Sequence, residues 1–388
     1  MFSVVFWAPS QKISSFLGGI VLTKPFKELD WLGKPENLQK KYPDLSRNVL
    51  VWQKQESLEL FNKVGYAERE KDRCWDLPGK GNSYADCGKT KVKGCDNPEH
   101  ENGKVLRRLY RHNCRRKACP VCFEGWAASE AERALIRLAS YVVGNREVKG
   151  LISDLKKGFE RRPKRVFHEA LVVRLENIIK EGRKDRSHSQ RPIHVVLSPP
   201  QHLDWHRRGV YEARRKKAYV IAKKSGLYGS SMIPHPYRLR CRNCKATIPD
   251  YVKQCVKCGS FEFEWFFSPH FHCVGFGWIH GTGEGYREHG WVVKNLGIRK
   301  SVYWTFQYLL SHAGVSKFHT VTWFGSLAYN KLRYVPVLGS VRELCPECGS
   351  VLRPMKWCLV DRPPPELIYS RDPYKNDSWE DPSEWRCF

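Results

Sequence analysis

The sequence predicts an α+β protein that carries several zinc modules, and three observations indicate this class. Short β-branched and aromatic runs at 192–200 and 261–279 are typical of strands. Segments 124–143 and 302–315 carry apolar residues at helical spacing, which predicts helices. Most of the 15 cysteines fall in close pairs within a long basic chain. That pattern favours thiolate metal sites in a reducing compartment over disulfides.

Changes in composition along the chain predict where its domains begin and end. The Cys-rich stretch has few apolar runs, so a metal must replace the missing core. After the strand at 192–200, a basic helix is predicted to end at Gly226. We expect a region without a usable motif at 1–73, a zinc module at 74–125, a basic helical segment at 126–190, a core at 191–332 with a zinc ribbon inserted at 238–260, and a Cys-bearing tail at 333–388.

The charge of the chain predicts its class of partner. Lys and Arg number 67 against 40 Asp and Glu, a formal net charge of +27. Such an excess repels itself unless it meets a polyanion, and nucleic acid is the obvious one. The 14 Trp add flat surfaces on which unpaired bases can stack. The sequence shows no membrane span or signal peptide, so we expect a soluble, intracellular protein without a membrane partner.

The clearest metal site is a zinc ribbon in the middle of the chain. Two Cys-x-x-Cys turns lie within one short segment, and together they can complete a tetrahedral zinc site. The four predicted ligands are Cys241, Cys244, Cys255 and Cys258. Since most such ribbons are structural or hold nucleic acid, zinc here is not expected to be catalytic.

Two further cysteine groups are incomplete in the sequence. Cys114, Cys119 and Cys122 predict a second zinc whose fourth ligand lies upstream. Our choices for that ligand are Cys95 and then Cys87, with Cys74, His100 and His112 as competitors. In the tail, Cys345 and Cys348 form one Cys-x-x-Cys pair, and Cys358 is nearby. A third zinc site there is possible from the sequence.

A different chemistry is indicated by histidines. His270 and His272 are two apart in a predicted strand, so they share one face, with Phe271 and Cys273 turned to the other. Tyr308 and His312 are four apart on a predicted helix and share a face there. Three imidazoles could hold a divalent ion with open positions for phosphate oxygens, and the tyrosine could attack the phosphorus.

The segments HVVLSPP, PHFHCVGFG and YLLSHAG follow a Cys-rich region in this order. They resemble the three motifs of the HUH endonucleases, in particular the rolling-circle replication initiators (Rep) of archaeal plasmids and viruses. The resemblance covers residues from about Cys87 to Leu332. It implies an antiparallel core sheet of about five strands with flanking helices. It also implies Mg²⁺ or Mn²⁺ at His270 and His272, and a 5′-phosphotyrosine link at Tyr308 that frees a 3′ hydroxyl primer.

Two positions after the tyrosine decide which residue roles of the family apply to this chain. Many relatives place a lysine three residues after the tyrosine, but this chain has Ser311. Some HUH transposases use a polar residue four after it as third metal ligand, and His312 fits that arrangement. We therefore expect His312 as third ligand, with His194 as second choice. Glu264 lies too far along the strand from His270, by about 20 Å, unless the chain folds back at Ser268–Pro269.

The expected partners are single-stranded DNA and an origin duplex or hairpin, with host replication proteins as further partners in an archaeal or bacterial cytoplasm. The side chains expected to hold phosphates are Arg207, Arg208, Arg214, Arg215, Lys216 and Lys217. Two alternatives stay open at this point. An HUH transposase or relaxase would use the same residues, and a non-catalytic zinc-ribbon nucleic-acid binder would have Tyr308 in its core.

Overall fold

The computed structural model describes most of the chain after residue 76. The described residues are 77–160, 164–182, 191–200, 208–248, 253–280, 282, 290–315, 319–333, 343–370 and 372–388. The chain divides into two compact units, Met1–Val49 and Leu50–Phe388, and every described residue belongs to the second. The region predicted at 1–73, Cys74 and Arg207 lie outside the described residues.

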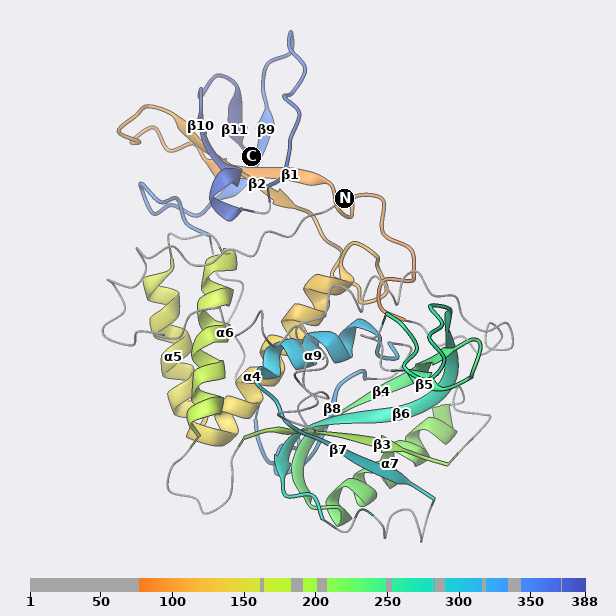
Figure 1. The fold of residues 1–388 in the computed structure, drawn as a ribbon. Coiled ribbons are helices and arrows are strands. Elements are labelled where there is room, and N and C mark those ends of the chain that lie inside the picture. The colour runs from red at the N-terminus through yellow and green to blue at the C-terminus, as the bar shows by residue number, and fades with distance from the viewer. Residues whose placement is uncertain are drawn as a thin grey trace. The chain divides into compact units, whose positions relative to one another are not determined.

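The described part is α+β, as the sequence predicts, but it has two antiparallel sheets where the sequence predicted one. The smaller sheet joins strands that are far apart in the sequence. Its order is β10-β2-β1-β9-β11, and we call it the small sheet (Figure 1). Its strands are β1 (Thr90–Cys95), β2 (Val105–Arg111), β9 (Arg353–Trp357), β10 (Asp377–Glu380) and β11 (Trp385–Cys387), with a 3-10 turn η5 (Pro373–Asn376) before β10.

Three helices follow the first two strands. They are α4 (Phe123–Val143), α5 (Asn145–Gly158) and α6 (Lys164–Glu181). Helix α4 forms where the sequence predicts one, because Ala131, Leu135, Leu138 and Val142 recur at helical spacing and all four are buried. Gly144 ends it with a φ of 101°, a conformation that glycine adopts without strain.

The larger sheet has six strands, against about five expected. Its order is β5-β4-β6-β3-β7, with β8 paired to β4. The strands are β3 (Ile193–Ser198), β4 (Leu227–Cys241), β5 (Thr247–Ile248), β6 (Phe263–Gly277), β7 (Val292–Ile298) and β8 (Thr322–Gly325). Strand β6 is continuous where the sequence suggested a bend at Ser268–Pro269. The register is irregular at this same point, because Ser268 and Pro269 of β6 lie opposite a single residue of β4, between the pairs His235–His270 and Tyr237–Phe267.

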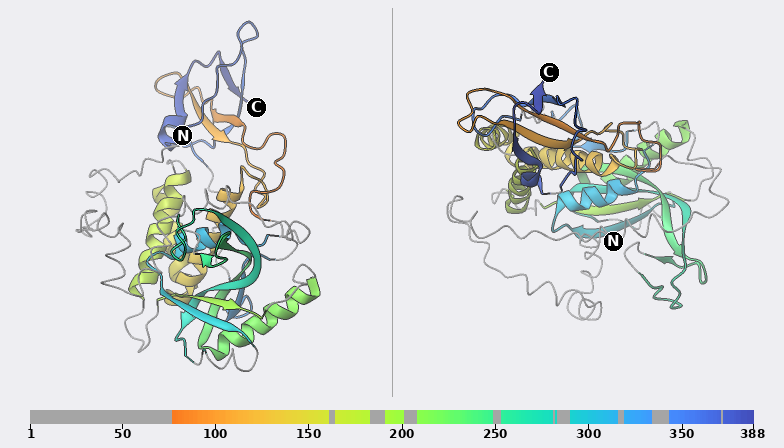
Figure 2. Two further views of the ribbon diagram at one scale, coloured as in Figure 1. Left: turned by 45° about the vertical axis from the view of Figure 1, so that its right-hand side comes forward. Right: turned by 90° about the horizontal axis from the view of Figure 1, so that it is seen from above.

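Different helices cover the two faces of the large sheet (Figures 1 and 2). Helix α7 (Arg208–Lys224) packs with Phe271 and Cys273 in one core. Helices α4 and α9 (Val302–Ser311) pack with Val274 and Phe276 in the other. Because side chains alternate along β6, His270 and His272 are on the face that α4 and α9 cover. None of the helices in the described residues is long and apolar enough to cross a membrane.

Candidate functional site

Three histidines come together on two neighbouring strands. His270 and His272 lie on β6, and His235 of β4 is opposite His270 in the strand register. One ring nitrogen from each lies within 4.8 Å of the others, and all three side chains are buried. We call these three residues the histidine cluster. It differs from the predicted ligand set, in which the third histidine was His312.

Hydrogen bonds fix which nitrogen two of these rings present. Nε2 of His235 donates to the carbonyl oxygen of Leu309 at 2.8 Å. Nδ1 of His270 lies 2.7 Å from the carbonyl oxygen of Ser268 and 3.3 Å from Nε of Arg238, and the shorter contact makes Nδ1 the donor to the carbonyl. Since a neutral imidazole carries one proton, Nδ1 of His235 and Nε2 of His270 keep their lone pairs. Metal-binding histidines are held by backbone carbonyls in this way, so both rings suit a cation.

His272 belongs to a chain of hydrogen bonds. Nη2 of Arg299 donates to Nδ1 of His194 at 2.5 Å, and Nε2 of His194 lies 2.7 Å from Nδ1 of His272. A guanidinium only donates, so Nε2 of His194 is the donor to Nδ1 of His272, and neutral His272 then carries its proton on Nε2. A cation at His272 would have to displace either this hydrogen bond or that proton. His194, the second choice for third ligand, therefore contacts a member of the cluster but does not join it.

Burial makes the cluster suitable for a cation. It lowers the pKa of His235, His270 and His272 well below the usual value, and neighbouring charged groups lower it further. The rings are therefore neutral at pH 7, which is the form that binds a metal. The donor set of three imidazoles with no carboxylate fits a divalent transition metal such as Mn²⁺ better than Mg²⁺, because Mg²⁺ prefers oxygen ligands.

Helix α9 places the candidate nucleophile beside this cluster. The ring of Tyr308 packs edge-on against His312 with centroids 4.7 Å apart, and His312 in turn packs against His235 at 4.5 Å. The backbone N–H of Gly314 donates to the carbonyl of Pro234 at 2.9 Å, which ties the end of the helix to β4. Tyr308 and His312 are therefore together, as predicted, but His312 lies between the tyrosine and the cluster.

A hydrogen bond fixes the tautomer of His312. Oγ of Ser311 donates to the carbonyl of Tyr308 at 2.6 Å, so it can only accept from Nδ1 of His312, 3.0 Å away. Nδ1 of His312 then carries the proton, and Nε2 is the nitrogen that can accept one. The helix ends at Ser311, so His312 is its C-cap rather than part of a third turn.

Two arginines beside the cluster were missed in the sequence. Arg238 of β4 donates to Oγ of Ser198 at 2.6 Å, and its Nε lies 3.3 Å from Nδ1 of His270. Burial lowers the pKa of Arg299 to about 10, and the negative charge of an ionised Tyr308 would act to raise it. Arg299 therefore lies within electrostatic range of the candidate nucleophile. Both guanidiniums can attract a phosphate.

The basic residues of α7 do not belong to this site. The helix packs on the other face of the sheet, in the core that contains Phe271 and Cys273. Of the predicted phosphate ligands, five are described, namely Arg208, Arg214, Arg215, Lys216 and Lys217. Their positions on α7 leave them able to bind nucleic acid only away from the histidine cluster.

The predicted ribbon cysteines come together at the far end of the β4–β6 pair. Sγ of Cys241 lies 3.5 Å from Sγ of Cys258, and Cys244 lies 3.5 Å from Cys255. Four thiolates around zinc at about 2.3 Å would be about 3.8 Å apart, so the spacing is compatible with zinc. A hydrogen bond from the backbone N–H of Cys244 lowers the pKa of Cys241 to about 6, which favours the thiolate.

The second cysteine group is completed by Cys87. Its Sγ lies 3.0 Å from that of Cys122 and 3.6 Å from that of Cys119, and Cys114 is 3.6 Å from Cys122. These four form a cluster that could hold zinc. Cys95, our first choice for the fourth ligand, is not among them, because β1 carries it away to the small sheet.

Cys95 belongs instead to a third cluster with His100, Cys345 and Cys348. Nε2 of His100 is 3.3 Å from Sγ of Cys348 and 3.4 Å from Sγ of Cys345. Nδ1 of His100 lies 2.7 Å from the carbonyl of Lys104, which leaves Nε2 for a metal. The cluster is compatible with a Cys₃His zinc that joins residues more than 240 positions apart in the sequence. Cys358 is outside it; its thiol contacts the carbonyl of Lys356.

No family model, curated protein or solved structure matches this chain.

Proposed function

We propose that this protein is a metal-dependent endonuclease of the HUH type. It would nick single-stranded DNA at a replication origin through Tyr308 and so prime rolling-circle replication. The observation that carries the proposal is the continuous series of ring contacts from Tyr308 through His312 to the histidine cluster. A nucleophile and a cation site this close can act on the same phosphate. The three sequence motifs support the same reading.

The residues suggest how the nick is made. A divalent ion at the histidine cluster would supply Lewis-acid polarisation of the scissile phosphate. The hydroxyl of Tyr308 attacks the phosphorus and gives its proton to Nε2 of His312. The bond from phosphorus to the 3′ oxygen breaks, and that oxygen leaves as the 3′ hydroxyl with a proton taken from water. Arg299 stabilises the charge that develops on the tyrosine oxygen, since the two groups already interact.

The tyrosyl ester keeps the energy of the broken bond. Attack by a 3′ hydroxyl on the same phosphorus reverses the step and releases Tyr308, so rejoining needs no ATP. The histidines then have two tasks. The three of the cluster would hold the cation, and His312 transfers the proton.

The three cysteine-containing clusters would hold structural zinc. Two of them consist of four cysteines and the third of three cysteines and His100. The cluster of Cys95, His100, Cys345 and Cys348 lies at the small sheet, whose two cores are small, with five buried residues in one and four in the other. Because structural zinc contributes on the order of 10 kcal/mol in small modules, it can replace the missing core there.

A nicking assay with a matched tyrosine pair tests the proposal. Tyr308→Phe should abolish the covalent DNA adduct with Mn²⁺ and leave DNA affinity nearly unchanged, because only one hydroxyl is removed. Tyr303→Phe is the control, since Tyr303 lies five residues earlier on α9, roughly 140° around the helix. Adduct formation that depends on Tyr303, or persists without Tyr308, would contradict the assignment.

One observation favours a second candidate function. Tyr308 is only 9% exposed and belongs to the core that α4 and α9 form. A tyrosine with a purely packing role would look the same, as expected for a zinc-containing nucleic-acid-binding protein without activity. The same assay separates the two functions, because that protein would bind DNA and form no adduct with either tyrosine present.

A further inference from the structure

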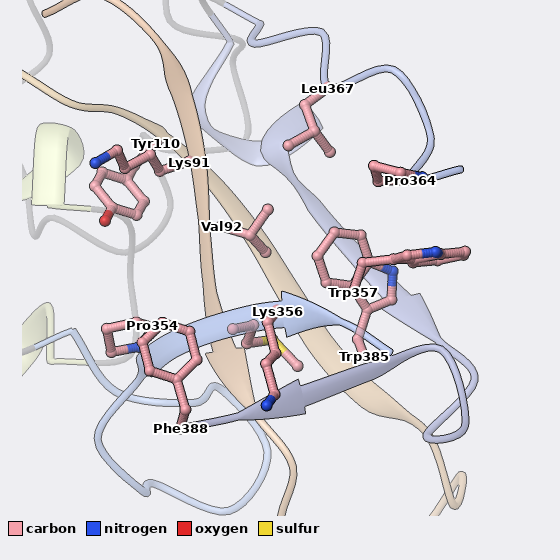
Figure 3. A pocket seen from close by; sticks show the side chains of 11 residues that line it. Lys91, Val92, Tyr110, Pro354, Lys356, Trp357, Pro364, Leu367, Trp385 and Phe388 are labelled. Atoms are coloured by element: carbon pink, nitrogen blue, oxygen red, sulfur yellow. The ribbon is translucent and has the colours of Figure 1, made fainter. Parts of the chain in front are cut away.

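Two pockets in the described part of the chain differ in the charge of their walls. One, of about 480 Å³, lies at the small sheet, and nine of its eleven lining residues are uncharged, among them Val92, Trp357 and Trp385 (Figure 3). The other, of about 350 Å³, lies between the end of α6, the segment before β3, the end of β7 and the start of α9. We call it the basic pocket, because four of its nine lining residues are cationic: Lys180, Arg191, Arg299 and Lys300.

The positive charge of the basic pocket is not balanced by its own wall. Three of the cations are exposed and have no carboxylate partner among the described residues, namely Lys180, Arg191 and Lys300. The one carboxylate of the wall, Glu176, is used by helix α9. Its Oε1 accepts from Oγ of Ser301 at 2.8 Å and from the backbone N–H of Tyr303 at 2.7 Å. Four positive charges against one negative charge leave the wall at +3, and an anion is the ligand that offsets such an excess.

Arg299 is the buried cation of the wall. It is 5% exposed, and its Nη2 donates to Nδ1 of His194 at 2.5 Å. Burial lowers the pKa of Arg299 to about 10, so its surroundings stabilise the charge less than water does. A guanidinium has five N–H donors in a planar fork that fits two oxygens of one phosphate. A phosphate in the basic pocket would therefore stabilise this buried charge.

Arg299 also connects the basic pocket to the histidine cluster. It donates to His194, and His194 donates to His272 at 2.7 Å. Arg299 is therefore two hydrogen bonds away from a member of the cluster. A DNA strand whose scissile phosphate lies at the cluster can place a neighbouring phosphate in the basic pocket.

The uncharged part of the wall indicates which part of a nucleic acid fits. Its members are aliphatic: Ile179, Pro192, Ile298 and Val302. No aromatic ring is among the residues that line the basic pocket, so a base has no ring there on which to stack. The pocket is therefore suited to the sugar–phosphate backbone rather than to a base or a free nucleotide.

We propose that the basic pocket binds one backbone phosphate of single-stranded DNA, next to the phosphate that is cut. Arg299 contacts it from the buried side, and the three exposed cations contact it from the rim. An acidic peptide is another polyanion that a wall of this charge could hold, but the connection to the histidine cluster favours DNA. The choice of DNA rests on the proposed function, whereas the anion site itself does not depend on the nicking chemistry.

Lysine footprinting of the full-length protein with Tyr308→Phe, which lacks the nucleophile, tests the pocket. The protein is acetylated with and without oligothymidine, and the modified lysines are quantified by mass spectrometry. Oligothymidine should slow the acetylation of Lys180 and Lys300 but not that of Lys157, which is exposed on α5 and does not line the pocket. A methylphosphonate oligothymidine of the same length, whose backbone is uncharged, should protect none of the three. Equal protection by both oligonucleotides would mean that no phosphate is bound and would overturn the proposal.

The salt dependence of oligothymidine binding gives the number of phosphates at the pocket. Replacing Lys180, Arg191 and Lys300 together by Ala removes only exposed side chains, so the variant should fold normally. The log–log salt slope should fall by about 0.7, because the three side chains share one phosphate. Lys157→Ala is the matched control and should leave the slope unchanged. A fall of about 2 would mean three separate phosphates and would overturn the proposal, as would a slope equal to that of the control.

Two further outcomes identify the ligand and separate the two proposals. Protection of Lys180 and Lys300 by oligoglutamate or thymidine monophosphate, but not by oligothymidine, would mean a different anion and would overturn the assignment. Protection by oligothymidine, with no covalent adduct formed by the parent protein, would support the pocket and count against the proposed function alone.

Discussion

His235 is the residue that the structure adds to the two sequence-predicted histidines of the candidate cation site, and its replacement gives a quantitative test. We choose His235→Gln, because the amide can still donate to the carbonyl of Leu309 that Nε2 of His235 now contacts at 2.8 Å. Leaving that buried carbonyl unsatisfied would cost about 1–3 kcal/mol and confuse the result. The variant should therefore fold normally and lose only the imidazole nitrogen that faces the ion.

The expected size of the effect follows from the ligand count. Losing a residue that merely orients a metal ligand typically weakens metal binding about 10- to 100-fold. Losing one of three ligands should cost at least the upper value, so half-maximal nicking should require about 100-fold more Mn²⁺, equivalent to about 2.7 kcal/mol. Nicking is measured against Mn²⁺ concentration, with zinc content and thermal unfolding as controls.

His312→Gln is the matched variant. It removes the proton acceptor beside Tyr308 and keeps the cluster, so nicking should slow at saturating Mn²⁺ with little change in the Mn²⁺ requirement. The reverse pattern, in which His312→Gln raises the Mn²⁺ requirement and His235→Gln does not, would refute the ligand assignment. It would restore His312 as the third ligand.

Three further predictions concern other parts of the chain. His100→Ala should lower the zinc content from three ions to two and reduce the hydrogen-exchange protection of β1 and β9. His112→Ala is the control and should keep all three ions. Zinc analysis of the purified variants measures both. Replacing Arg214, Arg215, Lys216 and Lys217 by Ala should weaken binding to all DNA sequences alike and reduce the dependence of affinity on salt concentration. The Mn²⁺ requirement should not change, because α7 lies on the other face of the sheet. A loss confined to one sequence would mean that this helix reads bases. Burial acts to raise the pKa of Glu343, but Lys93 and Arg108 outweigh it and lower the pKa. The ionised carboxylate therefore stabilises the fold above the unfolded pKa of about 4.3, and this stabilisation is lost as the pH falls through the lower folded pKa. In denaturant titrations, the stability difference between wild type and Glu343→Gln should disappear at acid pH.

Local patterns predicted the elements and the paired ligands well. The spacing of Ala131 and Leu135 predicts α4, and the parity of His270 and His272 predicts their shared face, because both depend only on helix or strand geometry. The ribbon cysteines were predictable for the same reason, since all four lie within 18 residues.

The missed residues depend on pairing between distant segments. His235 faces His270 only because the ribbon joins β4 to β6 and a register shift after His235 sets the alignment. No periodic pattern marked 227–241 as a strand. His100 and Cys345 meet only when the tail adds β9 to β1, so Cys95 was assigned to the wrong cysteine group. Register and tertiary pairing are not encoded in local spacing.

The most direct test of the central claim is to locate the covalent DNA on the protein. After incubation with Mn²⁺ and a single-stranded origin oligonucleotide, the adduct is digested with nuclease and trypsin. Cleavage after Lys300 and Lys317 gives one peptide, residues 301–317, that contains both Tyr303 and Tyr308. Fragmentation of this peptide by mass spectrometry distinguishes the two tyrosines. A nucleotide linked through a 5′ phosphate to Tyr308 is the predicted result. A nucleotide on Tyr303, or nicked DNA with no nucleotide on this peptide, would contradict the account.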